Sequence, residues 1–184
     1  MVIYIEYTIW LIDFIMKDLI KKILKEETQD EFILEIPNLL FIPGADLETP
    51  EGMTDAWNEL LRLLNGKPFI FDDDLDLTDT DITSLGNLQS VNGDLDLENC
   101  KNLNSLGNLQ SVGDYLDLSR TDITSLGNLK SVGSYLSLYK TNVTSLGNLE
   151  FVGESLFLKE TPISKKYSEE EIRQMVNVVG RVIL

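Results

Sequence analysis

One short phrase, present in four copies, constrains the fold more than any other feature of the chain. Thr-Ser-Leu-Gly-Asn-Leu begins at Thr83, Thr124 and Thr144, and the copy that begins at Asn104 differs only in its first residue. A repeat this short is typical of one turn of a solenoid, because each copy can bury its apolar residues only against the copies beside it. The copies are 21, 20 and 20 residues apart, counted from their first leucines, Leu85, Leu106, Leu126 and Leu146.

Each turn also contains a Leu-x-Leu pair, which predicts a short strand because a period of two places both leucines on one face. Strands of successive turns would stack in parallel at about 4.8 Å. Two more apolar columns would complete a common core. The sequence therefore predicts an α/β chain in which residues 67–165 form a solenoid with a parallel sheet of about five or six short strands. The pairs are Leu75/Leu77, Leu95/Leu97, Leu116/Leu118, Leu136/Leu138 and Leu156/Leu158, and the columns are Ile82, Leu103, Ile123, Val143, Ile163 and Val91, Val112, Val132, Val152.

These residues carry a family resemblance. Leu116-x-Leu118-x-x-Thr121-x-Ile123 resembles the leucine-rich-repeat segment Leu-x-Leu-x-x-Asn-x-Leu, and Leu95-x-Leu97-x-x-Cys100-x-x-Leu103 is similar to its longer, cysteine-type version. The repeats look like the short bacterial type of about 20 residues, found in secreted effectors and in proteins of tailed phages. The resemblance covers about residues 69–165. It implies a right-handed solenoid but no activity, because fold does not fix function. The Asn position is taken by Thr80, Thr121, Thr141 and Thr161.

A solenoid needs covers over its terminal turns, and the sequence predicts a helical cap at each end. Residues 54–66 read as an N-terminal capping helix that Thr54 begins and Asn65-Gly66 ends. In residues 166–184, Ser168-x-x-Glu171 predicts a capping box that opens a helix up to Asn177, with Ile172, Met175 and Val176 facing inward. After it, Val182-x-Leu184 matches the strand phrase and predicts a final strand.

Residues 1–53 fall outside the repeat. Apolar residues at helical spacing predict an amphipathic helix up to about Glu27, followed by a short extended run, Phe32 to Ile36, and a proline-containing loop. This helix could pack on the cap, dock in an assembly, self-associate or lie on a membrane surface. Glu6 and Asp13 argue against a signal peptide or a membrane span. The apolar positions are Ile5, Ile9, Ile12, Met16, Leu19, Ile20 and Ile23.

Met16 opens a second possible start, because the residues from Met16 to Glu26 form a complete amphipathic N-terminus. Within them, Leu24-Lys25-Glu26 is similar to the Leu-x-Glu cleavage signal that follows capsid-targeting leaders in some tailed phages. That likeness implies an internal virion protein.

Composition excludes several classes of function. The chain has 184 residues, 31 acidic against 15 basic side chains, no histidine and one cysteine. A net charge of −16 opposes direct nucleic-acid binding, although a basic partner remains compatible with it. The sequence contains no histidine and no recognisable phosphate-binding loop or activated nucleophile, so we expect neither an enzyme nor a cofactor. The acidic run from Asp72 to Asp81 lacks the spacing of known calcium loops, so we expect no metal site. A lone Cys100 cannot close a disulfide, which favours a reducing, cytoplasmic location.

The outward positions of the predicted strands change from acidic to aromatic along the stack. Stacked carboxylates repel one another, and aromatic side chains on a solvated strand suit interface anchors, so this face is our candidate partner-binding site. Tyrosine also suits exposed strands and aspartate resists edge pairing, so a purely structural explanation remains open. The candidate residues are Asp74, Asp76, Asp94, Asp96, Tyr115, Asp117, Tyr135, Ser137, Tyr139, Phe157 and Lys159.

The other regular columns have a structural explanation. Side-chain amides in a tight turn can satisfy backbone groups and can bond to one another from copy to copy. The glycines suit bends where the backbone is left-handed or crowded, and Cys100 is expected in the core. The amide column is Asn87, Asn108, Asn128 and Asn148, and the glycines are Gly86, Gly107, Gly127, Gly147 and Gly93, Gly113, Gly133, Gly153.

Together these observations predict a non-enzymatic protein–protein interaction module with a rigid, acidic-to-aromatic strand face. One alternative is a structural component of a larger assembly, such as a virion, docked by residues 1–27. Another is an acidic mimic of nucleic acid that occupies a basic DNA-binding protein.

Overall fold

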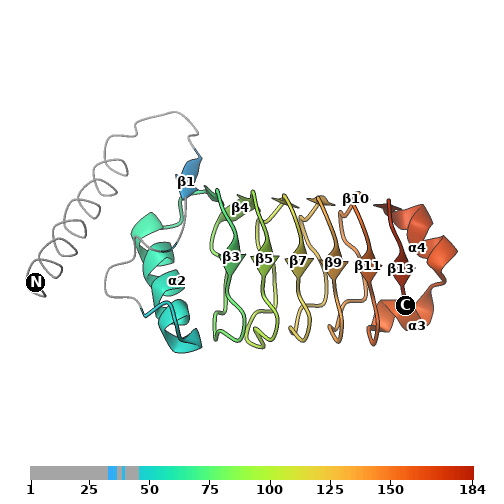
Figure 1. Cartoon of the computed structure of the whole chain (residues 1–184), viewed down its shortest axis with the longest axis horizontal. Helices are drawn as coiled ribbons and strands as arrows, with labels where there is room; N and C mark the ends of the chain where they lie inside the picture. Colours follow the sequence, from blue (N-terminus) through green and yellow to red (C-terminus); the bar gives the residue numbers. More distant parts are fainter. Residues whose placement is uncertain (1–32, 37–38, 40–45) are drawn as a thin grey trace, which may run out of the picture.

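The computed structural model describes residues 33–36, 39 and 46–184 of the chain (Figure 1). The predicted helix up to Glu27 and the candidate second start at Met16 lie outside these residues. Within this part of the chain, short strands and three helices follow one another along a single stack. In chain order they are β1 (Leu34–Ile36), α2 (Pro50–Leu64), β2 (Phe69–Phe71), β3 (Leu75–Asp76), β4 (Leu88–Val91), β5 (Leu95–Asp96), β6 (Ser111–Val112), β7 (Leu116–Asp117), β8 (Ser131–Val132), β9 (Leu136–Ser137), β10 (Phe151–Val152), β11 (Leu156–Phe157), α3 (Pro162–Lys166), α4 (Glu169–Met175), β12 (Asn177–Val178) and β13 (Val182–Ile183).

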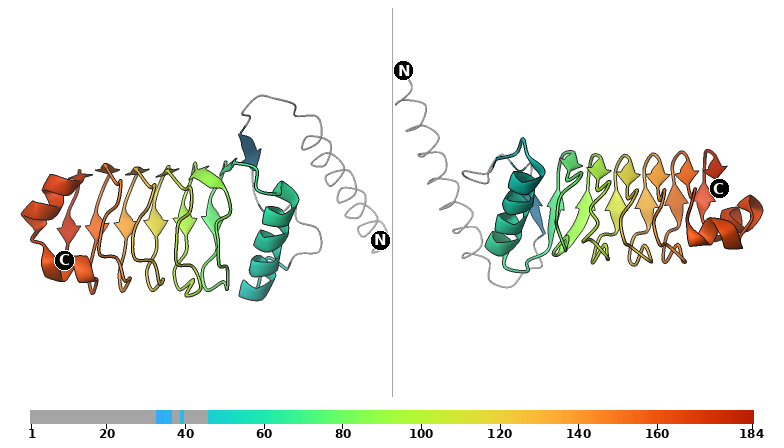
Figure 2. Two further views of the ribbon diagram at one scale, coloured as in Figure 1. Left: turned by 180° about the vertical axis from the view of Figure 1, so that it is seen from behind. Right: turned by 90° about the horizontal axis from the view of Figure 1, so that it is seen from below.

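Two parallel sheets, rather than one, form the walls of this β-solenoid. The predicted strands make a six-stranded sheet in the order β13-β11-β9-β7-β5-β3, here called the Leu sheet. A seven-stranded sheet, β1-β2-β4-β6-β8-β10-β12, is here called the Val sheet and was not predicted. The two views of Figure 2 show the turns stacked along one axis, with α2 at one end and α3 and α4 at the other. From β2 to β13 each turn contributes one strand to each sheet, and β1 adds a seventh strand to the Val sheet alone.

Successive turns pair in the same register, so equivalent repeat positions become neighbours. Leu95 pairs with Leu116, and Leu116 pairs with Leu136. Backbone bonds continue this pairing beyond the short strands, as from Leu116 N–H to the Tyr135 carbonyl at 3.0 Å. These bonds satisfy backbone N–H and carbonyl groups that lie beyond the ends of the short strands.

The predicted apolar columns all lie in one continuous core between the sheets. The threonines at the Asn position are also buried, and each hydroxyl donates a hydrogen bond to the carbonyl three residues earlier, as Thr121 Oγ1 does to Leu118 O at 2.7 Å. Cys100 occupies the same position, and its Sγ donates to the Leu77 carbonyl at 3.0 Å. Cys100 is therefore a core residue, as predicted, and burial raises the pKa of its thiol.

Helix α2 begins at Pro50, four residues before the predicted Thr54. Its N-cap is Thr49, whose side chain accepts the Gly52 N–H, and Pro50 occupies the first helical position, where its missing N–H leaves no hydrogen bond unmade. Thr54 lies inside the helix and instead accepts the Asp81 N–H at 3.0 Å. The end of the helix is as predicted, because Asn65 is left-handed, with φ 49°.

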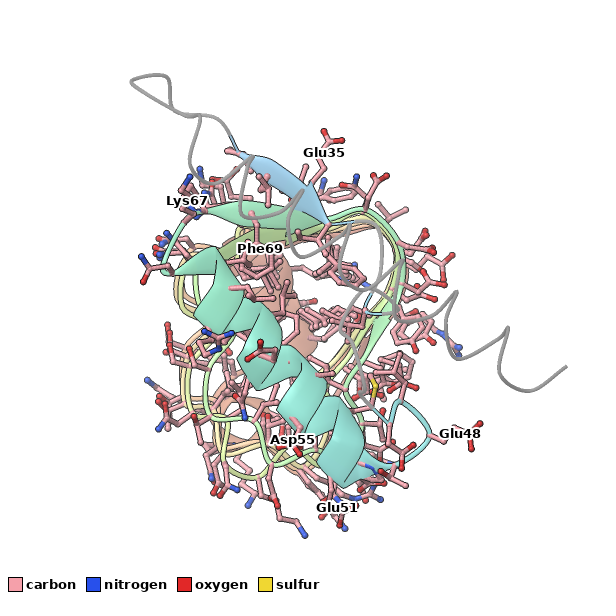
Figure 3. The ribbon with its side chains drawn as sticks, turned by 90° about the vertical axis from the view of Figure 1, so that its left-hand side faces the viewer. Glu35, Glu48, Glu51, Asp55, Lys67 and Phe69 are labelled. Atoms are coloured by element: carbon pink, nitrogen blue, oxygen red, sulfur yellow. The ribbon has the colours of Figure 1, made fainter. Side chains whose placement is uncertain are left out.

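The buried side of α2 faces the first turn of the solenoid. Trp57 is fully buried, its Nε1–H donates to the Ser84 carbonyl at 2.9 Å, and its ring lies 6.0 Å from that of Phe69. Figure 3 looks onto this end and shows α2 lying diagonally across it. Beside the helix, β1 pairs in parallel with β2, which places the Leu34–Ile36 part of the predicted extended run in the Val sheet.

At the other end the chain forms two short helices. The Ser168–Glu171 capping box is present and begins α4, as predicted, and its hydrogen bonds lower the pKa of the Glu171 carboxyl. Helix α4 ends at Met175, not Asn177, because Asn177 and Val178 pair with β10. Met175 is 45% exposed, so the prediction that it faces inward was wrong. Helix α3 was not predicted, whereas the final strand, β13, pairs with β11 as expected.

Arg173 of α4 ties the last turn together. Its guanidinium donates to the Val178 carbonyl at 2.8 Å and to the Gly180 carbonyl at 2.7 Å, while Nε donates to Glu169 at 2.9 Å. The two carbonyls flank the connection between β12 and β13, which are the edge strands of the two sheets at this end.

We expect Arg173→Ala to lower the free energy of unfolding by about 1–2 kcal/mol, because charge-assisted hydrogen bonds are lost and two carbonyls lose their donor. Urea titration followed by circular dichroism measures the change. Arg181→Ala is the matched control, since the Arg181 side chain is exposed and makes no bond to another described residue; it should shift stability by less than about 0.5 kcal/mol. Equal effects of the two substitutions would contradict this role of Arg173.

Candidate functional site

The predicted binding residues lie on the outer face of the Leu sheet. Pairing places the residue between each pair of leucines next to its equivalent in the following turn. This central column is therefore continuous from an acidic to an aromatic end, as the strand period predicted. From β3 to β11 it contains Asp76, Asp96, Asp117, Ser137 and Phe157.

Three aromatic rings from consecutive turns pack together on this face. The rings of Tyr115 and Tyr135 stack with centroids 5.0 Å apart and planes 4° from parallel. Phe157 meets Tyr135 edge-on, with centroids 6.1 Å apart and planes at 81°. All three side chains are half-buried. We call Tyr115, Tyr135 and Phe157 the aromatic cluster.

Tyr139 does not join this cluster, although the sequence placed it with the others. Its hydroxyl donates to Glu160 at 3.2 Å, and its ring lies 5.0 Å from the Lys140 ammonium and 5.6 Å from the Arg120 guanidinium. These contacts fix Tyr139 among charged side chains at the margin of the face. Lys159, the last candidate, is exposed beside β11.

The aspartates of the face have a role that the sequence analysis missed. The central Asp96 and Asp117 each accept the backbone N–H two residues later, at 2.9 and 2.7 Å, and Asp76 does the same at 2.9 Å. Asp74 and Asp94 accept the backbone N–H of the equivalent residue in the next turn, at 2.8 and 3.0 Å. Hydrogen bonding of this kind offsets part of the repulsion between stacked carboxylates.

The aromatic cluster therefore lies beside fixed negative charge. Tyr115 donates its hydroxyl to Asp96 at 3.1 Å. Burial, and then Asp96, raises the pKa of Tyr115, and burial, with Asp94 and Asp117 next, raises the pKa of Tyr135. Both phenols stay protonated at neutral pH, and the surrounding potential favours cations.

Two polar contacts that were not predicted join neighbouring turns of the face. Ser119 and Ser137 share a hydrogen bond of 2.7 Å between their hydroxyls. Arg120 forms an ion pair with Glu98 of the preceding turn. No sequence motif marks either pair, because each contact depends on which two side chains lie one turn apart.

Within residues 33–36, 39 and 46–184, no group of three or more acidic or cysteine side chains could hold a metal ion. None of the helices in this part is long and apolar enough to cross a bilayer. No protein-family model, no curated protein and no solved structure matches the chain.

Proposed function

We propose that this protein is a non-enzymatic interaction module that binds a protein partner through the aromatic cluster and the carboxylates beside it. One observation carries the proposal: three aromatic rings from consecutive turns are packed edge to face and face to face on an otherwise polar strand face. Aromatic side chains dominate the binding energy of many interfaces, because they bury large areas for little loss of rotamer entropy.

Rigidity adds to this argument. Each ring is attached to a backbone that is hydrogen-bonded to the turns on both sides, and Tyr115 is also held through Asp96. A surface that is already ordered loses little entropy when a partner binds. The stack therefore suits a ligand that meets several turns at once.

The proposed partner is basic at the point of contact. The side chains around the two tyrosines are acidic, and the chain as a whole has a charge of −16. Negative charge of this kind accelerates association with cations, and tyrosine faces bind Lys or Arg groups directly. Arg120 and Lys140 already occupy the ring of Tyr139 in this way.

We expect Tyr115→Ala with Tyr135→Ala to weaken partner binding by about 2 kcal/mol or more, because the two substitutions remove adjacent anchors. The test is an affinity capture with the immobilised full chain, identification by mass spectrometry and then titration of the purified partner. Tyr139→Ala is the matched control, since Tyr139 is also a tyrosine of this face but lies outside the aromatic cluster. It should leave binding unchanged.

Circular dichroism must show that the double variant keeps its sheet, and Tyr115→Phe with Tyr135→Phe should retain most of the affinity. Capture of the same partner by the double alanine variant, at the same affinity, would contradict the proposal. Loss of the partner from Tyr139→Ala as well would extend the interface to Tyr139 and contradict its restriction to the aromatic cluster.

Finer structural expectations belong to the same proposal. The buried threonine column, in which each hydroxyl donates to the carbonyl three residues earlier, supports a right-handed, leucine-rich-repeat-like solenoid. The positions of α2 and α4 support helical caps. A cytoplasmic location remains part of the proposal. Docking in an assembly through residues 1–27 is a separate proposal, tested by deleting them. Mimicry of nucleic acid predicts binding that weakens steeply with salt even in the tyrosine variants.

A further inference from the structure

A polar groove follows one corner of the solenoid, away from the aromatic cluster. Its volume is about 350 Å³. It lies between the asparagine column and a second column, which is formed by the residue two positions after each asparagine. We call it the amide groove. It is lined by Gln89, Asn108, Gln110, Asn128, Lys130 and Asn148, so every lining side chain is polar.

Part of the hydrogen-bonding capacity of these amides holds the turns together. Asn128 and Asn148 donate to the Gly107 and Gly127 carbonyls at 3.1 and 3.0 Å. Asn108 donates to the Asn87 side chain at 2.6 Å. In the second column Gln110 donates to the Gln89 side chain at 2.7 Å. The structural role predicted for the asparagine column is confirmed.

The other half of each amide remains available. A carboxamide has two N–H donors and one acceptor oxygen with two lone pairs, and each asparagine of the groove uses a single donor. No described residue donates to the side-chain oxygens of Asn108, Asn128, Asn148 or Gln110. The Lys130 ammonium, with three donors, makes no ion pair with a described residue. Each turn thus presents a free donor beside a free acceptor.

We propose that the amide groove binds an extended, neutral oligosaccharide, with one sugar ring placed against each turn. A sugar hydroxyl both donates and accepts, which matches a surface that offers both at every step. The turns repeat at about 4.8 Å along the axis. A pyranose ring in an extended chain, measured from one glycosidic oxygen to the next, is only slightly longer than this repeat, so one ring can lie against each turn. Successive rings of such a chain are turned over, so the same hydroxyls return at every second turn.

Other ligands fit this groove less well. An extended peptide advances about 3.3 Å per residue, so its polar groups would lose register with the turns, and its apolar side chains would find no apolar lining. A nucleic acid or an acidic polysaccharide would meet the net charge of −16. Without an aromatic ring in the lining, affinity rests on a few hydrogen bonds to exposed groups, and we expect a dissociation constant in the millimolar range.

The experiment is a nuclear magnetic resonance titration of the ¹⁵N-labelled full chain with three neutral hexasaccharides: cellohexaose and chitohexaose, which are extended, and maltohexaose, which is helical. We expect the extended sugars to shift the side-chain amide signals of Asn108 and Asn128 in a saturable way. Maltohexaose should bind about tenfold more weakly, because a helical chain keeps few hydroxyls in register with a straight row.

Gln110→Ala with Lys130→Ala is the test variant, because it removes two lining groups but keeps the bonds that asparagines make to the backbone. It should weaken binding about tenfold. Lys101→Ala, at an exposed lysine outside the groove, should not. No shift at Asn108 and Asn128 with any of the three sugars would overturn the proposal, and so would equal binding by both variants.

This inference does not rest on the proposed protein interface. Tyr115→Ala with Tyr135→Ala should leave the sugar-induced shifts unchanged, since the aromatic cluster does not line the groove. Shifts that disappear in this double variant would assign sugar binding to the Leu sheet and overturn the assignment to the amide groove.

Discussion

Gly133→Ala is expected to destabilise the solenoid by about 3 kcal/mol or more, which is a large part of the total stability of a typical domain. An alanine Cβ at this position would lie 1.8 Å from the Gly113 carbonyl oxygen and 2.8 Å from its carbon. Both atoms belong to the backbone of the preceding turn, so no side-chain rotation relieves the clash. The two turns would have to separate and would weaken the bonds between them, such as that from Gly133 N–H to the Val112 carbonyl at 3.0 Å.

The matched control is Gly127→Ala, in the other glycine column. Gly127 has φ +56°, but no atom lies within 4 Å of its would-be Cβ. Only the left-handed backbone opposes a side chain there, and the reduced entropy of the unfolded chain offsets part of that cost, so we expect a loss of about 1 kcal/mol. Urea unfolding of both variants measures the difference, and a Gly127→Ala loss equal to that of Gly133→Ala would contradict the crowding argument.

The two glycine columns illustrate what repetition makes predictable. Crowded or left-handed bends were predicted for both. In the structure, Gly113, Gly133 and Gly153 are crowded by the backbone of the preceding turn, and Gly86, Gly107, Gly127 and Gly147 have a left-handed backbone. The apolar columns were predictable for the same reason: a position occupied by Leu or Val in every copy has the same environment in every turn.

The Val sheet could not be predicted in the same way. Its strands in the repeats consist mainly of a Ser-Val dipeptide, such as Ser111–Val112 and Ser131–Val132, which is too short to show alternation. These strands exist because the neighbouring turns hold them in register, not because of local propensity. The valines were placed correctly in the core, but the sheet was missed.

A left-handed column also lacked a sequence signal. The residue before each core threonine or Cys100 has φ between 57° and 63°, yet no glycine occupies the position. Polar side chains tolerate this conformation at some cost, and contacts between turns supply the difference. The residues are Asp79, Asn99, Arg120, Lys140 and Glu160.

For the candidate site, the period of two was enough to predict which residues share the face. It was not enough to predict their contacts. Tyr115 and Tyr135 occupy the same position in consecutive repeats and stack on each other. Tyr139 occupies a different position, after the second leucine of its turn, and meets the charged residues Lys140 and Glu160. Side-chain direction depends on the residue one turn away, and that residue varies even where the backbone repeats.

Trp57→Ala is expected to cost about 3–5 kcal/mol, because it removes a fully buried aromatic side chain from the junction of α2 with the first turn. The cavity would lie beside Phe69 and would also leave the Ser84 carbonyl without the indole N–H at 2.9 Å. If α2 caps the stack, its loss exposes the edge of β3, and we expect aggregation as well as a lower urea midpoint.

Trp57→Phe separates the loss of volume from the loss of the hydrogen bond, since phenylalanine fills most of the volume but cannot donate. It should cost about 1–2 kcal/mol. Asn58→Ala, on the exposed side of the same helix, is the control and should change stability by less than about 0.5 kcal/mol. A Trp57→Ala protein that unfolds at the wild-type urea concentration and stays monomeric would show that the solenoid is stable without this contact and would reject the capping role of α2.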